Sequence, residues 1–314
     1  MLSFIARRLA LAIPTLILIT VFTFALQKLL PGDPLLTLAG EERDPQVLDY
    51  LRVKYRLDDP LLQQYFAWMG GVLQGDLGIS LKTDQPVLEL ILQKLPTTIE
   101  LAFLSMLVAF VIGIPAGIIS AVRKGTVVDL GVNVVALSGI SIPNFWLGVL
   151  LILVFSVQLR WLPASGFTPF TEDPVQNLRT LILPSIVIGS GLAATLMRHT
   201  RGAMLSVLRQ DYIRTARAKG LLPPAIILKH AFRNALVPII TLSTLLFGEL
   251  IGGAVLTEQV FTIPGFGKLI VDAVFNRDYA VVQGVVLCVG VAFVLLNLAA
   301  DILYVVVNPR MRTG

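Results

Sequence analysis

Long stretches without any charged side chain constrain this chain more than any other feature of its sequence. Five runs contain no Asp, Glu, Lys or Arg, and they cover residues 9–27, 101–122, 130–159, 180–197 and 279–300. A bilayer core about 30 Å thick is crossed by about 20 apolar residues in a helix. Because lipid offers the backbone no hydrogen-bond partner, a helix is the conformation in which each run bonds its own backbone groups. The runs therefore predict five transmembrane helices.

A sixth run, residues 235–257, is apolar except for Glu249. It is long enough for a span if the carboxyl group of Glu249 faces protein or water instead of lipid. The composition agrees with this interpretation, because 55% of the residues are hydrophobic and only 14% are charged, against roughly 25% charged in an average soluble domain. An ordinary water-soluble enzyme is thereby excluded. We predict an all-α membrane protein with six transmembrane helices.

The loop charges predict the orientation of these helices. Basic residues collect on one side of the predicted membrane, where Asp129 and Asp211 are the only acidic residues in the loops. An excess of Lys and Arg marks the cytoplasmic side, so we expect both termini to be cytoplasmic. Since topology accounts for the net charge of +5, no nucleic-acid partner is indicated. The basic residues are Arg7, Arg8, Arg123, Lys124, Arg198, Arg201, Arg209, Arg214, Arg217, Lys219, Lys229, Arg233, Arg310 and Arg312.

On the outer side the sequence predicts one long insertion, residues 31–96, after the first span. Apolar residues at helical spacing predict amphipathic helices over 47–55 and 61–73. A third helix is expected to open at Pro86 and to be broken by Pro96 before the second span. The helices could pack on the ends of the spans, dock an external partner, or do both. The chain then divides into 1–30, the insertion 31–96 and a five-helix core 97–314.

Motifs for catalysis are absent from the sequence. It contains no GxxxxGK[ST], HExxH or GxSxG pattern, and its histidines, His199 and His230, have no carboxylate or thiol at ligand spacing. The single cysteine, Cys288, allows neither an intrachain disulfide nor a cysteine-based metal site. We therefore expect no catalytic, cofactor or metal site. An ion-coupled secondary transporter stays the alternative, although such carriers usually hold more intramembrane titratable groups than Glu249 alone.

The cytoplasmic loop between the fourth and fifth spans, residues 198–238, is the most informative segment. Its first part has an apolar face and should be helical up to Gly220, because glycine adopts the left-handed conformation that closes a helix without a steric penalty. Pro223 and Pro224 should prevent the helix from resuming before Ala225. A short basic helix held between two spans suits insertion into a cleft on another protein.

Two stretches of this loop, Asp211 to Gly220 (DYIRTARAKG) and Lys229 to Pro238 (KHAFRNALVP), resemble the cytoplasmic loop of ABC importer permeases in the dipeptide, oligopeptide and nickel family. The Glu-Ala-Ala opening of many such loops is replaced here by Arg214-Thr215-Ala216. Similar segments occur along essentially the whole chain: Leu30-Pro-Gly-Asp-Pro34, Leu57-Asp-Asp-Pro60, Gly75-Asp-Leu-Gly78, Leu95-Pro96, Ser141-Ile-Pro143, Glu258 to Phe261, Pro264-Gly-Phe-Gly267 and Asn308-Pro-Arg310.

The resemblance implies a type I ABC importer permease fold with a large external loop after the first helix. It implies an ATP-driven permease for peptides or similar small polar solutes, in a bacterial or archaeal plasma membrane. The expected partners are a homologous second permease, two cytoplasmic ABC ATPase subunits that use ATP and Mg²⁺, and an external solute-binding protein. Relatives that carry glutathione or nickel chelates leave the particular solute open.

The resemblance also assigns candidate site residues. An ATPase-coupling helix would comprise Asp211, Tyr212, Arg214, Thr215, Ala216, Arg217, Ala218, Lys219 and Gly220. A second group is a candidate for the transport pathway or the interface with the second permease, because Pro143 can bend a helix, Asn144 and Glu249 are polar within spans, and glycines let helices approach closely. This second group comprises Pro143, Asn144, Glu249, Gly252 and Gly253.

Overall fold

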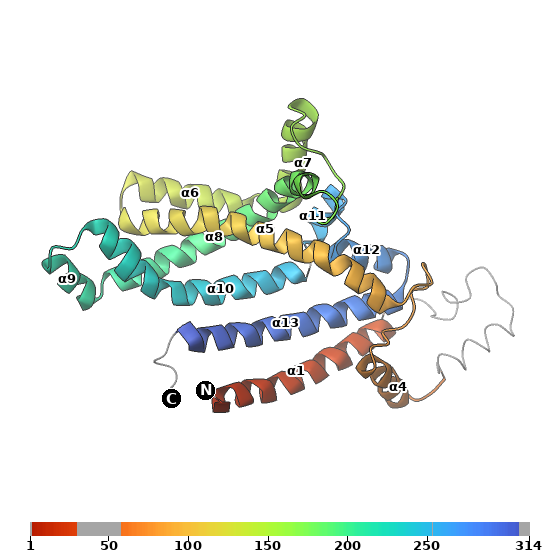
Figure 1. Ribbon diagram of the computed structural model, residues 1–314. Coiled ribbons are helices and arrows are strands. Elements are labelled where there is room, and N and C mark those ends of the chain that lie inside the picture. Colours follow the sequence, from red (N-terminus) through yellow and green to blue (C-terminus); the bar gives the residue numbers. More distant parts are fainter. Residues whose placement is uncertain (1, 30–57, 253, 308–314) are drawn as a thin grey trace.

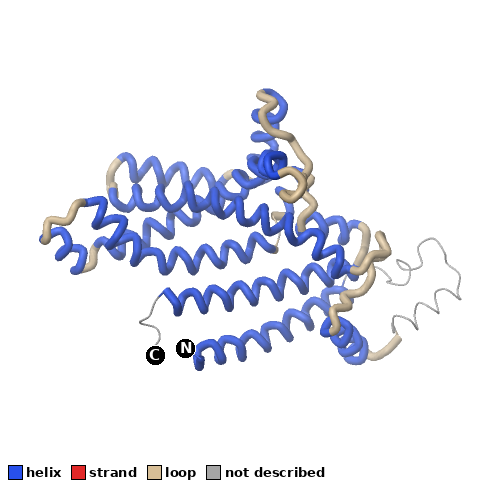
Figure 2. Tube along the Cα trace, in the orientation of Figure 1, coloured by secondary structure: helices blue, strands red, loops and turns tan. Residues whose placement is uncertain are grey.

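The computed structural model describes residues 2–29, 58–252 and 254–307. These residues form helices joined by turns, and one isolated antiparallel bridge pairs Ile79 with Pro86 (Figures 1 and 2). The prediction of an all-α protein is confirmed. The α-helices are α1 (Leu2–Leu29), α4 (Leu61–Leu73), α5 (Val87–Val122), α6 (Val127–Ser141), α7 (Asn144–Leu151), α8 (Pro174–Leu208), α9 (Asp211–Ala218), α10 (Arg233–Ile251), α11 (Val255–Phe261), α12 (Phe266–Phe275) and α13 (Tyr279–Val307), and the π-helices are η1 (Ile152–Gln158) and η2 (Ala225–Phe232).

Several predicted features lie outside the described residues. These are the helix expected over 47–55, the segments 30–34 and 308–310, and Gly253. Within the described part, α4 confirms a helix over 61–73, although several of its apolar side chains, such as Leu62 at 72% and Phe66 at 68%, are exposed. Five stretches are long and apolar enough to cross a membrane, namely α1, α5, α8, η2 with α10, and α13. The sixth predicted span corresponds to a bent pair of helices.

The bent pair consists of α6 and of α7 continued by η1, which meet at an angle of 97°. Ile142 and Pro143 separate them in extended conformations, with ψ of 122° and 130°. Proline has no N–H to donate and disfavours helical geometry in the residue before it. The bend predicted at Pro143 is thus confirmed, and α7 stands away from the other long helices in Figure 1. A straight helix over 130–159 is excluded.

Helix α5 runs without interruption through Pro96 and Pro115. The predicted break at Pro96 is therefore wrong, and the boundary expected at residue 96 falls inside a helix. The carbonyl groups that an internal proline frees can be satisfied by neighbouring helices and local adjustment, which is why membrane helices tolerate proline. Pro86 precedes the first turn, as predicted, and the external helix and the second span are one element.

The core of the bundle is the close pairing of α5 with α8. Glycines make this approach possible, because a Cβ atom on Gly113 would lie 2.6 Å from the carbonyl oxygen of Ala193. A Cβ atom on Gly117 would lie 2.6 Å from the Cβ of Thr200, and one on Gly189 would lie 2.7 Å from the carbonyl oxygen of Ser105. No larger residue fits between two backbones at these distances. The backbones of α5 and α8 therefore touch at three levels.

A second apolar cluster lies where α5 begins, against α12 and the start of α13. Val87 is fully buried there, and a Cβ atom on Gly284 would lie 2.5 Å from its Cγ1. The loop before α5 is fastened to the same place, because the hydroxyl of Ser80 donates a 2.5 Å hydrogen bond to Asp278. This part of the insertion packs on the ends of the long helices. Docking of an external partner stays a prediction.

Helix α1 lies at the edge of the bundle, next to α13 (Figure 1). Gly290 of α13 faces Ile19, whose Cγ2 would lie 2.8 Å from a Cβ on that glycine. On the other side the hydroxyl of Thr20 is 2.8 Å from that of Tyr65 in α4. Most of the other large side chains described in α1 are exposed, as expected of a helix surrounded by lipid.

Candidate functional site

Helix α9 is a short element that projects from the end of the bundle, beyond α8 and α10 (Figure 1). Its end confirms the prediction for Gly220, whose φ is +74°. The N–H of Gly220 donates to the carbonyl of Arg217 at 2.9 Å, and that of Leu221 donates to Ala216 at 3.3 Å. This pair of bonds is the Schellman arrangement, in which the left-handed residue turns the chain back and satisfies the last carbonyls of the helix.

One face of α9 packs against the core and the other is exposed. Ile213 and Ala216 are buried among the apolar side chains of the main core, which holds the helix at a fixed orientation. Arg214 pairs with Asp211 at 3.4 Å, but both side chains are largely exposed, so the pair contributes little stability. The exposed candidate coupling residues are Asp211, Tyr212, Arg214, Thr215, Arg217, Ala218, Lys219 and Gly220.

The chain after α9 resumes helical structure at Pro223, so the prediction that the two prolines delay it until Ala225 is wrong. Proline fits the first turn of a helix, where its missing N–H would have no partner within the helix. The helix continues as the π-helix η2 and passes without a break into α10. The hydroxyl of Tyr212 reaches the carbonyl of His230 in η2 at 3.5 Å. Helix α9 is therefore connected to one long helix on each side, α8 and η2 with α10, so that a force on α9 acts on both.

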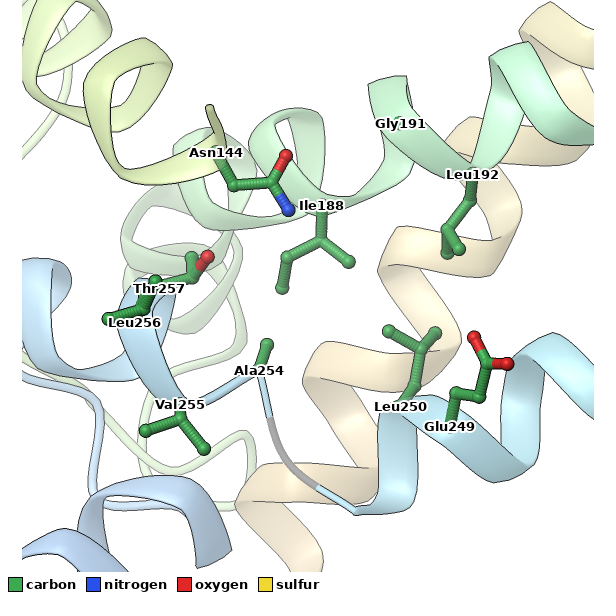
Figure 3. Close-up of a pocket in the computed structure, with 10 residues that line it drawn as sticks. All are labelled: Asn144, Ile188, Gly191, Leu192, Glu249, Leu250, Ala254, Val255, Leu256 and Thr257. Carbon is green, nitrogen blue, oxygen red and sulfur yellow. The ribbon is translucent and has the colours of Figure 1, made fainter. Parts of the chain in front are cut away.

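Two of the candidate pathway residues, Asn144 and Glu249, line one cavity of about 330 Å³ between α7, α8, α10 and α11 (Figure 3). They approach it from opposite walls, and the remaining lining is mainly apolar, including Ile188 and Leu192. Pro143 directly precedes α7 and so determines where Asn144 lies. The structure thus brings together polar groups that are far apart in the sequence, which is the arrangement expected of a solute pathway.

Gly248 lies in α10 and Gly252 directly follows it, and both face another helix of the same chain. A Cβ atom on Gly248 would lie 3.0 Å from the ring of Phe293, and one on Gly252 would lie 3.6 Å from Val289. Both neighbours belong to α13 of the same chain. The close approach that Gly248 allows is therefore internal, whereas a Cβ on Gly252 would meet Val289 at an ordinary contact distance. The contribution of Gly252 to the interface with a second permease stays a prediction.

Glu258 is fully buried between α11 and the start of α12 and explains a motif found in the sequence. Its carboxylate accepts a 2.9 Å hydrogen bond from the N–H of Lys268 in the first turn of α12. A Cβ atom on Gly265 would lie 2.5 Å from the same carboxyl group, and one on Gly267 would lie 2.7 Å from the Cα of Val255. The two glycines of Pro264-Gly-Phe-Gly267 therefore leave the space in which the carboxyl group of Glu258 packs against the start of α12.

Burial raises the pKa of Glu258 to about 7, although hydrogen bonds from the backbone of Lys268 and Gly267 oppose this shift. Between the usual pKa of a glutamate and about 7 the folded protein binds more protons than the unfolded chain, so its stability falls as pH rises through this window. We expect Glu258→Gln to remove that fall. Thermal unfolding in detergent at about pH 5 and about pH 8 measures it. Glu172→Gln, in an exposed loop, should behave like the unaltered protein, and an unchanged pH dependence in Glu258→Gln would contradict the assignment.

The sequence did not predict an ion pair between a buried carboxylate and a partly exposed guanidinium at the predicted cytoplasmic ends of α5, α6 and α8. Arg201 of α8 donates from both Nε and Nη2 to the two carboxylate oxygens of Asp129, each at 2.9 Å. The same carboxylate accepts bonds from Ser120 at the end of α5 and from Asn133 of α6. One feature of the sequence could have indicated this ion pair: Asp129 is a lone acidic residue at the start of a predicted span that follows a basic loop.

Comparison with protein families gives matches along nearly the whole chain. Residues 113–313 match the family described as binding-protein-dependent transport system inner membrane component. Residues 1–102 match the family of N-terminal segments of such membrane components. Between them the two matches include α9, the residues that line the cavity and the cluster around Glu258.

Individual relatives are similar over nearly their full length. The di/tripeptide transport system permease protein DppB of Pseudomonas aeruginosa is 46% identical over 333 residues, and the oligopeptide permease protein AppB of Bacillus subtilis is 43% identical over 314 residues. The glutathione permease protein GsiC of Escherichia coli is 43% identical over 312 residues. Each alignment covers 99% of both chains.

A solved structure supports the fold independently. A chain of the MetNI methionine ABC transporter, in an inward-facing conformation, is similar with a TM-score of 0.56 and 22% identity. The similarity covers 70% of this chain and 96% of that one. The predicted type I importer permease fold is confirmed.

Proposed function

The chain belongs to the family of binding-protein-dependent transport system inner membrane components, and from this premise we propose that it carries peptides or similar small polar solutes. It is a multi-pass permease subunit of an ABC importer and not an enzyme. The substrate class is taken from relatives named for di/tripeptides, oligopeptides and glutathione. A mainly apolar cavity with a few polar side chains, Asn144, Glu249 and Thr257, is compatible with solutes of this kind.

The proposed mechanism depends on helix α9, which packs on the core with one face and exposes the other. In the assembly that we propose, this chain pairs with a homologous second permease, two ABC ATPase subunits hold ATP and Mg²⁺, and an external binding protein delivers the solute. The exposed face of α9, with Arg217 and Lys219, enters a cleft of one ATPase. When ATP draws the ATPases together, α9 moves and displaces α8 and α10 as levers. The cavity between them then opens to the other side of the membrane.

The test is uptake of a labelled dipeptide by proteoliposomes that contain the complete complex. Uptake should require ATP and the binding protein, and it should stop when the ATPase subunits are omitted. Solute movement by the isolated permease down an ion gradient, without ATPases, would instead establish the secondary-carrier alternative.

The orientation that we propose places both termini and α9 in the cytoplasm. It is supported by the basic residues on that side, because Lys and Arg are retained there. Single cysteines in a Cys288→Ser background test it in sealed cells. An impermeant thiol reagent should label Leu62→Cys, whose parent side chain is 72% exposed in α4, but not Arg209→Cys. Labelling of Arg209→Cys alone would reverse the orientation.

Glu249 is proposed to face the solute pathway. Glu249→Gln keeps the shape of the side chain and removes its charge, so the complex should assemble normally. We expect peptide uptake to fall by about fivefold or more, since a lone carboxylate within a span is usually retained for function. Glu172→Gln, in an exposed loop, is the control for loss of one carboxylate charge. Full uptake by Glu249→Gln would show that the charge is not required.

A further inference from the structure

The ion pair between Asp129 and Arg201 fixes three helices to one another. The Asp129 side chain is almost fully buried, since the residue is only 6% exposed, and Arg201 holds it with two parallel hydrogen bonds. Arg201 also donates from Nε to the hydroxyl of Ser120 at 2.9 Å. The backbone N–H of Gly125 supplies a further bond at 3.0 Å. The carboxylate is thus fully engaged by α5, by α6, by α8 and by the turn between α5 and α6.

A gain in the free energy of folding does not by itself explain why this ion pair is present. Burying the charge of Asp129 costs free energy, which the partly exposed Arg201 offsets only in part, and apolar residues of similar volume often stabilise a core as well or better. A two-point contact between a guanidinium and a carboxylate does, however, define position and angle in a way that apolar side chains do not. The pair is therefore better suited to fixing the register of α6 on α8 than to adding stability.

The remaining contact between α6 and α8 would permit sliding. It is formed by small or slender side chains, with Ala136 against Ala194 and Met197. Towards the other end of α6, a Cβ atom on Gly139 would meet Ala194 at an ordinary distance of 3.7 Å. The opposite face of α6 is exposed, including Val135 at 73%. Packed helices without interlocking side chains can shift by shear, so the ion pair is the contact that resists such a shift.

The pair also lies on the direct route from α9 to the cavity. Arg201 is about two helical turns before the end of α8, and α9 follows almost immediately. From Asp129, helix α6 leads to the bend at Pro143 and then to Asn144 in the cavity wall. Movement of α8 that is passed to α6 through the pair must therefore also displace Asn144.

We propose that the Asp129–Arg201 ion pair is a positioning element that makes α6 and α7 follow α8 when α9 is displaced, so that both walls of the cavity move in one step. This inference rests on the proposed function, because it assigns a path to the motion that ATPase subunits impose. Neither residue touches the solute. Without the pair, α8 moves while α6 lags behind, and ATP is consumed without completing transport.

The experiment uses the complete reconstituted complex with Arg201→Lys and Asp129→Asn. Lysine keeps the opposite charge but loses the two-point geometry, so Arg201→Lys should assemble even if Asp129→Asn does not. Asp84→Asn, an exposed change on the predicted external side, is the matched control. We expect the number of ATP molecules hydrolysed per peptide imported to rise by about threefold or more in Arg201→Lys and to stay unchanged in the control.

A distance measurement separates positioning from simple loss of folded protein. Spin labels at Val135 in α6 and Val175 in α8, both exposed, report the relation of the two helices. With the pair intact, their distance should be the same with and without trapped ATP; in Arg201→Lys it should shift or broaden when ATP is trapped. Unchanged distances and an unchanged ATP-to-peptide ratio would overturn the proposal, as would equal losses of hydrolysis and uptake. Failure of uptake in the unaltered complex would count against the proposed function instead.

Discussion

Replacing Gly117 with valine is expected to prevent stable folding of the protein in the membrane. Even a single Cβ atom at this position would lie 2.6 Å from the Cβ of Thr200 and 2.7 Å from the carbonyl oxygen of Met197. Neither neighbour is the movable end of a side chain, so α5 and α8 must separate. Overpacking of this kind costs about 3 kcal/mol or more, a large part of the total stability of a typical protein.

The yield of protein in membranes and the thermal unfolding temperature in detergent measure this effect. Gly131→Val is the control, because it introduces the same side chain in the middle of α6, at a glycine whose Cβ would meet nothing within 4 Å. We expect Gly131→Val to accumulate and unfold like the unaltered protein. Equal yield and equal unfolding temperature for the two variants would show that α5 and α8 are not in backbone contact at Gly117.

The second large effect is expected at Gly220, where the defect should be one of coupling and not of folding. A φ of +74° is costly for a β-branched residue, by about 1–2 kcal/mol. A Cβ at this position would meet nothing within 4 Å, so Gly220→Val acts through the backbone alone. Loss of the left-handed turn breaks the bonds to Arg217 and Ala216 and frays the end of α9. We expect peptide-stimulated ATP hydrolysis and uptake to fall by about fivefold or more.

Gly220→Asn is the matched control, because asparagine tolerates the left-handed conformation. It should retain most of the activity, while Gly220→Val assembles with its partners but does not respond to solute. Arg217→Glu reverses a charge on the exposed face of α9 and should produce the same uncoupling while glycine at position 220 keeps the left-handed turn. Normal stimulation in both Gly220→Val and Arg217→Glu would exclude α9 as the coupling helix.

The sequence predicts those features that depend on a short stretch of chain. Charge-free runs identified the membrane spans, because hydrocarbon excludes charge wherever a helix crosses it. Gly220 and Pro143 each impose a local backbone geometry, so the left-handed turn and the bend could be predicted from single residues. The same local reasoning failed at Pro96, where the freed backbone group is compensated by the surroundings of a membrane helix and the helix continues.

Features that depend on two distant segments were not predictable in this way. The spacing of Gly113 and Gly117 does fit the small-residue pattern of close helix pairs, but only the fold identifies α8 as the partner. Asp129 and Arg201 were both assigned to topology by their charge, and nothing in the sequence indicated that they meet. Asn144 and Glu249 were each noticed as polar residues within spans, whereas the cavity that joins them depends on the bend at Pro143.

The position of α1 has a consequence for biosynthesis. Its main partner in the bundle is α13, the last helix that the structure describes in this 314-residue chain. At about 5–20 residues per second, a ribosome needs on the order of tens of seconds to progress from one to the other. Throughout that time α1 is without the neighbour that Ile19 packs against. A helix in which most of the described large side chains can face lipid is suited to this interval, because it is stable in the bilayer before its partner has been made.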